Sequence, residues 1–202
     1  WELRQKIDGE WQIPHRYNDS GWNNFRPMSP ELPVQLWCMS GSASDADRIL
    51  RIGNPDRLNH AFSARGGGGN AGWFRFVNGN APDYPEHILQ TSYNAVSQAL
   101  DEIRDDDVAP DKLYIQHWIS RNPVICNALL QLTTGTPNPI YHGGLVQSRL
   151  RYFDVDQKRP GLPPNVAALI DQIEFENHPQ ESFRLQLVNL SPIHNQSLYL
   201  QT

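Results

Sequence analysis

The spacing of hydrophobic residues predicts helices in the first part of the chain. Apolar residues recur every three to four positions from Ile88 to Ile103, which is the spacing of one helix face, and Pro85 suits the first helical turn. Shorter helices are predicted over Pro33–Ser40 and from Ser44 onwards, because glycines follow both segments. Residues 1–27 show no sustained period and are predicted to form a loop packed over something larger.

A further helix of about three turns is predicted between Asn122 and Gly135. The Asn122 side chain can accept backbone hydrogen bonds as an N-cap, Pro123 suits the first helical position, and Gly135 can adopt the left-handed conformation that ends a helix. After Gly144 the hydrophobic period changes to two, which is typical of strands. A short helix is predicted to start at Pro163 or Pro164, and the C-terminal residues are predicted to form a β-hairpin.

Helices followed by strands predict an α+β fold. We assign residues 1–142 to a helical portion and residues 143–202 to a β-rich C-terminal portion. Successive helix pairs joined by long polar loops would suit an (α/α) toroid. The sequence begins with Trp1 rather than Met and stops within a predicted strand, so we expect it to be a fragment.

The glycine-rich segment does not predict a nucleotide site. Gly67, Gly69 and Gly72 satisfy the spacing G-x-G-x-x-G, but the aromatic run Trp73–Val77 that follows is strand-like. A dinucleotide site needs a helix there, whose N-terminus holds the pyrophosphate. We therefore predict no cofactor.

Composition narrows the possible partners. The 202 residues carry a net charge of −5, which argues against a general nucleic-acid-binding protein. Cys38 and Cys126, the only cysteines, lie in apolar patterns and predict buried free thiols, and no metal site is indicated. No apolar run approaches the roughly 18 to 20 residues of a membrane span. Nothing in the sequence predicts a compartment.

Polar and aromatic side chains gather in residues 114–153, on both sides of the helix predicted from Asn122. This arrangement is typical of a pocket wall. Each residue also has a structural explanation, such as capping for Asn122 or a core position for Trp118. The candidate catalytic residues are His117, Arg121, Asn122, Tyr141 and His142, and the candidate substrate-binding residues are Asn24, Arg26, Trp118 and Arg149.

The C-terminal segment FRLQLVNLSPIHNQSLYLQ resembles the β-sandwich strands of bacterial proteins that combine an (α/α) toroid with a sandwich. Many polysaccharide lyases and some glycoside hydrolases have this arrangement. The segments PNPIYHGG, RYFD, RPGLPPNVAALI and LVNLSP are also similar to a group of bacterial proteins without a known activity. The first resemblance implies a toroid followed by a sandwich, but a fold alone does not fix a function.

The resemblance and the residue types together favour a carbohydrate-active enzyme, with β-elimination at a uronate as the leading reaction. Arg121 and Asn122 would bind the substrate carboxylate, assisted by His117. Tyr141 or His142 would transfer the proton, and Trp118 would stack on a sugar ring. The partner would be a carbohydrate or another polar, even anionic, small molecule.

Two alternatives stay open. A glycoside hydrolase needs two carboxylates across the scissile bond, and Asp19, Asp83 and Glu86 are available. A non-catalytic carbohydrate-binding or structural protein could use its tryptophans as stacking surfaces. The sequence does not decide whether the chain is an enzyme.

Overall fold

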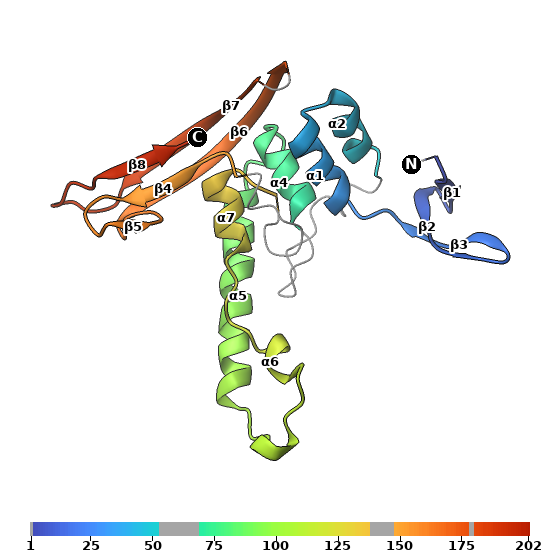
Figure 1. The fold of residues 1–202 in the computed structure, drawn as a ribbon, viewed down its shortest axis with the longest axis horizontal. Helices are drawn as coiled ribbons and strands as arrows, with labels where there is room; N and C mark the ends of the chain where they lie inside the picture. Colours follow the sequence, from blue (N-terminus) through green and yellow to red (C-terminus); the bar gives the residue numbers. More distant parts are fainter. Residues whose placement is uncertain (1, 53–68, 138–147, 178–179) are drawn as a thin grey trace.

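A computed structural model describes residues 2–52, 69–137, 148–177 and 180–202. The chain has a mixed α+β fold, with small antiparallel sheets at both ends of its long axis and helices between them (Figure 1). The helical elements are α1 (Glu31–Ser40), α2 (Ala43–Leu50), α4 (Asn70–Val77), α5 (Tyr84–Arg104), the 3-10 helix η1 (Pro110–Lys112), α6 (His117–Ser120) and α7 (Asn127–Thr134). The strands are β1 (Gln5–Ile7), β2 (Glu10–Asn18), β3 (Gly21–Pro27), β4 (Arg151–Asp154), β5 (Arg159–Pro160), β6 (Val166–Asn177), β7 (Gln180–Asn189) and β8 (Leu198–Gln201).

The predicted (α/α) toroid is wrong, although the α+β class is consistent with the structure. A toroid needs helices of similar length that pair side by side around a ring. Here α5 has 21 residues and projects from the centre, whereas α1, α2, α4 and α7 have 10 or fewer (Figure 1). The C-terminal strands form two small sheets, ordered β5-β4-β8 and β6-β7, instead of a sandwich that follows a toroid. The predicted boundary between residues 142 and 143 lies outside the described residues and stays a prediction.

The prediction of a loop over residues 1–27 is wrong, because residues 5–27 form the antiparallel sheet β1-β2-β3. Asp8 and Gly9 connect β1 to β2 with φ angles of 50° and 85°. Positive φ at both central residues is the geometry of a two-residue hairpin turn, and Asp-Gly is a sequence that favours it. Most side chains of the sheet are half-buried or exposed on both faces, so the strands lack a clear apolar alternation.

Several predicted helices are confirmed. The helix α1 ends where Gly41 adopts a left-handed φ of 59°, and α5 begins with Pro85 in its first turn. The helix α7 ends at Gly135 as predicted, but it begins at Asn127 rather than near Asn122. The Asn122 side chain instead accepts a hydrogen bond of 2.9 Å from the Val124 backbone nitrogen, which forms a turn ahead of the helix.

The strand-like interpretation of Trp73–Val77 is wrong, since this run belongs to α4. Nearly every residue of α4 is buried, and Trp73 and Val77 are both 0% exposed. A helix that is buried on all sides has no polar face, so its period cannot be distinguished from that of a buried strand.

The helix predicted after Pro163 is also wrong, because Val166–Asn177 is the long strand β6. Its pairing with β7 shifts register between Ile170 and Gln172. This irregularity lets both Ile170 and Ile173 point into the core, with exposures of 0% and 2%. A β-bulge of this kind breaks the alternation of two and leaves a spacing of three that imitates a helix.

The predicted C-terminal β-hairpin is wrong as well. Strand β8 pairs with β4, with Leu200 opposite Tyr152, whereas β7 pairs with β6. The strand predicted after Gly144 is confirmed only for the short segment that forms β4.

The hydrophobic core joins α1, α4 and β6 around Trp37. The Trp37 ring stands edge-on to Trp73, Phe74 and Phe175, with centroid distances of 6.3, 4.8 and 5.2 Å. Cys38 is buried beside this cluster, and burial raises the pKa of its thiol to about 12, which agrees with the predicted buried thiol. Cys126 is also a free thiol but only half-buried.

A buried polar network fixes the base of α5 against α4 and α7. The Tyr84 hydroxyl lies 3.0 Å from both the Gly69 carbonyl oxygen and Gln131 Oε1, so it can donate to either. The Gln131 amide in turn donates to Asn70 Oδ1 over 2.9 Å. Because buried polar groups need specific partners, this network fixes the direction in which α5 leaves the centre.

Candidate functional site

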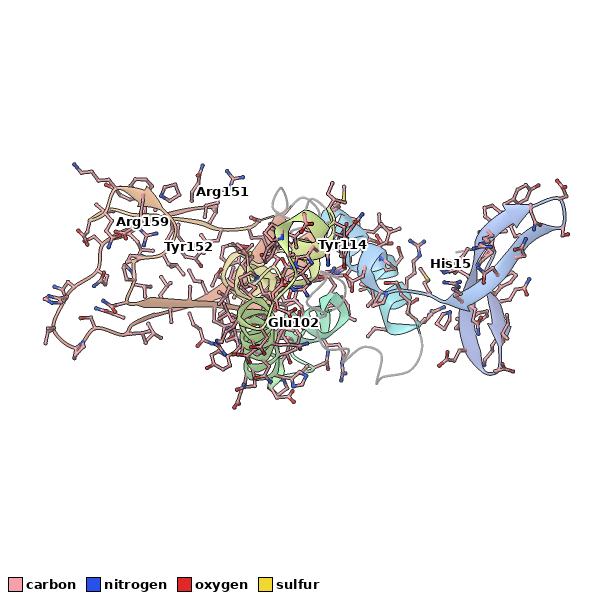
Figure 2. The ribbon with its side chains drawn as sticks, turned by 90° about the horizontal axis from the view of Figure 1, so that it is seen from below. His15, Glu102, Tyr114, Arg151, Tyr152 and Arg159 are labelled. Carbon is pink, nitrogen blue, oxygen red and sulfur yellow. The ribbon has the colours of Figure 1, made fainter. Side chains whose placement is uncertain are left out.

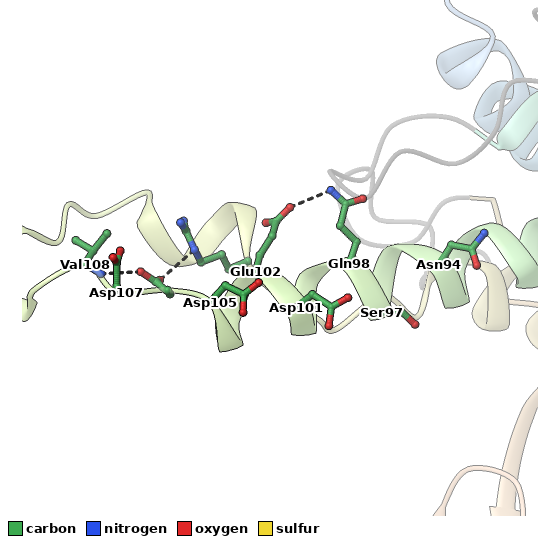
Figure 3. Close-up of a pocket in the computed structure, with 10 residues that line it drawn as sticks. Asn94, Ser97, Gln98, Asp101, Glu102, Asp105, Asp107 and Val108 are labelled. Atoms are coloured by element: carbon green, nitrogen blue, oxygen red, sulfur yellow. Dashed lines mark hydrogen bonds and ion pairs between the residues drawn. The ribbon is translucent and has the colours of Figure 1, made fainter.

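The far end of α5 forms one side of a groove of about 710 Å³. Carboxylates and amides line it, and in Figure 3 Gln98 and Glu102 extend from the same side of the helix, where the Gln98 amide donates to Glu102 over 2.9 Å. The groove carries five carboxylates against one guanidinium, so its potential is negative. The lining residues are Asn94, Ser97, Gln98, Asp101, Glu102, Asp105, Asp106, Asp107, Val108 and Arg121.

Asp106, His117 and Arg121 form a cluster beside the groove that joins the end of α5 to α6. His117 is 2% exposed, and its Nε2 contacts Asp106 Oδ2 in a short hydrogen bond. Arg121 Nε lies 3.0 Å from the same oxygen, and Arg121 Nη1 donates to the His117 carbonyl over 3.1 Å. Since α6 has only four residues, these contacts hold it in place better than its own backbone bonds can.

Two exposed aromatic rings stand edge-on to His117. Trp118 lies 4.9 Å from the His117 ring at an interplanar angle of 85°, and Tyr114 lies 5.8 Å away at 88°. Trp118 is 52% exposed and Tyr114 is 60% exposed, so both present an accessible face. The buried imidazole therefore packs against two aromatic rings that are both accessible to solvent.

Asp106 is held in its ionised form. Burial alone would raise its pKa, but hydrogen bonds from His117 and the Val108 backbone, together with the charge of Arg121, lower the pKa below its ordinary value. Because the folded-state pKa is lower than the unfolded-state pKa, the resulting stability is complete above the unfolded value and is lost as pH falls through the folded value.

We expect Asp106→Asn to lower the stability of the protein at pH 6 but much less at acidic pH. As pH falls below the ordinary carboxyl pKa of about 4, the advantage of the wild type over asparagine shrinks, and it disappears once pH has fallen through the lower pKa that Asp106 has in the folded protein. Urea unfolding at pH 6 and at about pH 3 would measure this difference. The matched control is Asp107→Asn, which changes the neighbouring, exposed carboxylate. A gap between wild type and Asp106→Asn that is unchanged at low pH would contradict the role assigned to this carboxylate.

The structure brings together only part of the predicted site. His117, Trp118 and Arg121 lie in one cluster, whereas Asn24 and Arg26 belong to β3 in the N-terminal sheet. Asn24 Oδ1 accepts a hydrogen bond of 3.3 Å from Arg26 Nε within that sheet. Figure 2 shows the separation, with His15 of the N-terminal sheet at one end and Tyr114 near the centre.

Arg149 is a core residue rather than a substrate-binding residue. Its side chain is 2% exposed and lies 3.2 Å from Glu181. It also donates to the Gly135 carbonyl over 2.6 Å, and its guanidinium lies over the Phe175 ring at 5.5 Å. These contacts leave it no access to a ligand at the α5–α6 groove.

Asn122 has a local structural role, because its side-chain oxygen bonds the Val124 backbone. Tyr141 and His142 lie outside the described residues, so their proposed proton-transfer role stays a prediction. Within the described ranges, no group of three or more His, Cys, Asp or Glu side chains is placed to hold a metal ion. No helix in the described part of the chain is both long and apolar enough to cross a membrane.

Sequence reasoning missed Asp106 and Tyr114 as members of the cluster. Asp106 stands within three consecutive aspartates, directly after the end of α5. Its side chain is 6% exposed, whereas Asp105 and Asp107 are exposed residues. Nothing in three identical residues indicates which of them turns toward a histidine 11 positions later.

This α+β protein, with an aromatic and acidic site at the end of a projecting helix, can be placed in a family. The profile of a family described as a domain of unknown function, DUF8034, matches residues 2–130. The chain belongs to this family, and the His117 cluster lies inside the matched region. No curated protein and no solved structure is significantly similar to the chain.

Proposed function

We propose that the chain binds a neutral carbohydrate at the α5–α6 groove. The observation that carries this proposal is the exposed Trp118 ring, held by a buried histidine–aspartate pair next to a groove lined by amides and carboxylates. Sugar rings offer a face of C–H groups that packs on an aromatic ring and hydroxyls that bond planar polar side chains. A rigid aromatic surface beside such groups suits this kind of ligand.

Electrostatics favours a neutral sugar over the uronate of the elimination reaction. That reaction needs a free positive group to neutralise the substrate carboxylate. In the groove, Asp106 already offsets the charge of Arg121, and further carboxylates of α5 would repel an anion. His117 is also too deeply buried to reach a ligand directly, so we assign it to positioning Trp118.

Titration of the protein with neutral hexasaccharides of glucose, xylose and mannose, followed by calorimetry, tests the proposal. We expect Trp118→Ala to weaken binding about tenfold or more, equivalent to ~1.4 kcal/mol or more, because the stacking surface is lost. Trp22→Ala is the matched control, since Trp22 is 50% exposed but lies in the N-terminal sheet. Equal affinity in wild type and Trp118→Ala, or no binding of any hexasaccharide, would overturn the proposal.

Glycoside hydrolysis is a second candidate, because several carboxylates of α5 line the same groove. Hydrolysis needs a pair of carboxylates on either side of the bond. Measurement of reducing ends together with ultraviolet absorbance separates the reactions, since hydrolysis produces only the former and elimination produces both. If hydrolysis occurs, Asp101→Asn and Asp105→Asn should abolish or strongly reduce turnover while hexasaccharide binding persists.

A further inference from the structure

The helix α5 carries an apolar stripe that no described element covers. Its five members follow one another at alternating spacings of four and three residues, which is the repeat of a coiled-coil seam. Leu89, Tyr93 and Leu100 are 39%, 68% and 47% exposed, although all are large apolar side chains. The seam consists of Leu89, Tyr93, Val96, Leu100 and Ile103, of which Val96 and Ile103 are half-buried.

The seam is distinct from the face by which α5 joins the rest of the protein. That face is formed by Tyr84, Ile88, Ser92 and Ala99, all of which are buried. An α-helix turns by about 100° per residue. The centre of this buried face therefore lies roughly 90° around the helix axis from the centre of the seam. Figure 1 shows α5 projecting from the other helices, with α6 along only one side of its free end. The helix is therefore preformed, and the described elements leave most of its seam uncovered.

We propose that the seam binds the same seam of a second copy of the chain, in an antiparallel helix pair. Around a two-fold axis at Val96, Leu89 would face the partner subunit's Ile103. Tyr93 would face the partner subunit's Leu100. Every seam residue is thereby matched by an apolar residue, as an isologous interface requires.

Charge complementarity selects a second copy and sets the orientation. Glu86 and Arg104 are 18 residues apart, which is five helical turns, so they lie on the same flank of the seam at opposite ends. An antiparallel copy brings each Glu86 to the partner subunit's Arg104, and the symmetry forms this pair twice. A parallel copy would form no such pair, because Glu86 would lie level with the partner subunit's Glu86, five helical turns away from Arg104.

The existing contact of Arg104 does not prevent this pairing. Arg104 lies 2.7 Å from Asp101 within its own helix, but both side chains are largely exposed, at 73% and 62%. Such surface pairs are weak. The Arg104 guanidinium has enough donors to bind Asp101 and a second carboxylate at once.

Mass measurement by light scattering and sedimentation at about 1 to 100 µM tests the proposal. We expect the 23.0 kDa chain to approach twice that mass as concentration rises. Leu100→Asp should keep the chain monomeric over this range, because it places a charge in the seam. Leu36→Asp is the matched control, since Leu36 is 44% exposed on α1, and it should leave the dimer intact. Circular dichroism of each variant verifies that it is folded.

Charge reversal tests the register. Glu86→Arg and Arg104→Glu should each weaken the dimer several-fold, and the double variant should restore it, because the pair is reformed with opposite signs. A chain that stays monomeric at every concentration, or a dimer that Leu100→Asp does not affect, would overturn the proposal. Failure of the double variant to restore association would exclude the antiparallel arrangement.

Discussion

Replacement of Arg149 by alanine is expected to lower the free energy of unfolding by about 2 to 4 kcal/mol, because a buried guanidinium loses its hydrogen bonds to backbone carbonyls and its packing. Arg149 contacts three parts of the fold at once. Its Nε lies 3.2 Å from Glu181 of β7, and its Nη1 donates to the Gly135 carbonyl at the end of α7. Its Nη2 donates to the Cys38 carbonyl of α1 over 3.5 Å.

The loss at Arg149 has two physical sources. The carbonyl groups at the ends of two helices would lose a charged donor, and unsatisfied buried acceptors are costly. The aliphatic part of the side chain would also leave a cavity. Urea unfolding of Arg149→Ala and Arg51→Ala measures the effect. Arg51 pairs with Asp47 at 2.6 Å on the surface, where it is 61% exposed, so its removal should cost less than about 1 kcal/mol. Equal losses in the two variants would contradict the role of Arg149.

Replacement of Trp37 by alanine should also cost about 3 to 5 kcal/mol, because it removes a large ring from the centre of the core. The ring is 3% exposed. It also makes edge-to-face contacts with aromatic rings of α4 and β6, each of which adds roughly 0.5 to 1.5 kcal/mol to simple burial. Thermal and urea unfolding would both detect this change.

Trp22→Ala provides the comparison for Trp37, because Trp22 is 50% exposed and contacts Tyr17 in a two-ring pair at the surface. Its loss should cost about 1 kcal/mol or less. Trp37→Phe keeps an aromatic ring and should fall between the two. A loss for Trp37→Ala no larger than that for Trp22→Ala would show that this core position is not central.

The sequence predicts best the elements whose signals are local. The ends of α1 and α7 are marked by Gly41 and Gly135, which adopt φ angles of 59° and 62°. The start of α5 is marked by Pro85 in its first turn. Capping and turn chemistry depends on a few neighbouring residues, so it can be identified without the rest of the fold.

The elements that were predicted wrongly depend on distant partners. The strand β6 takes its conformation from β7, and the bulge after Ile170 conceals its alternation. The strand β8 pairs with β4, more than 40 residues earlier in the chain, as in the match of Leu200 with Tyr152. Such pairings are set by tertiary packing rather than by intrinsic preference.

In the candidate site, too, the sequence predicted what depends on neighbouring residues and missed what depends on distant ones. The sequence grouped His117, Trp118 and Arg121 because they are neighbours, and the structure brings them together around Asp106. The sequence also suggested Arg149, because an arginine near aromatic residues suits a binding site as well as a buried structural position. Only the burial of the side chain distinguishes these roles.

The contact between Trp37 and Phe175 has a consequence for how the protein is made. The two rings lie 5.2 Å apart but are separated by 138 residues in the chain. A ribosome must therefore synthesise β6 before the helix α1 can complete its packing, and contacts of such long range slow the search for the native state. The region matched by the family profile ends at residue 130, ahead of β6. A nascent chain stopped there still exposes one side of Trp37, so the helical core depends for its completion on a strand that emerges after the matched region.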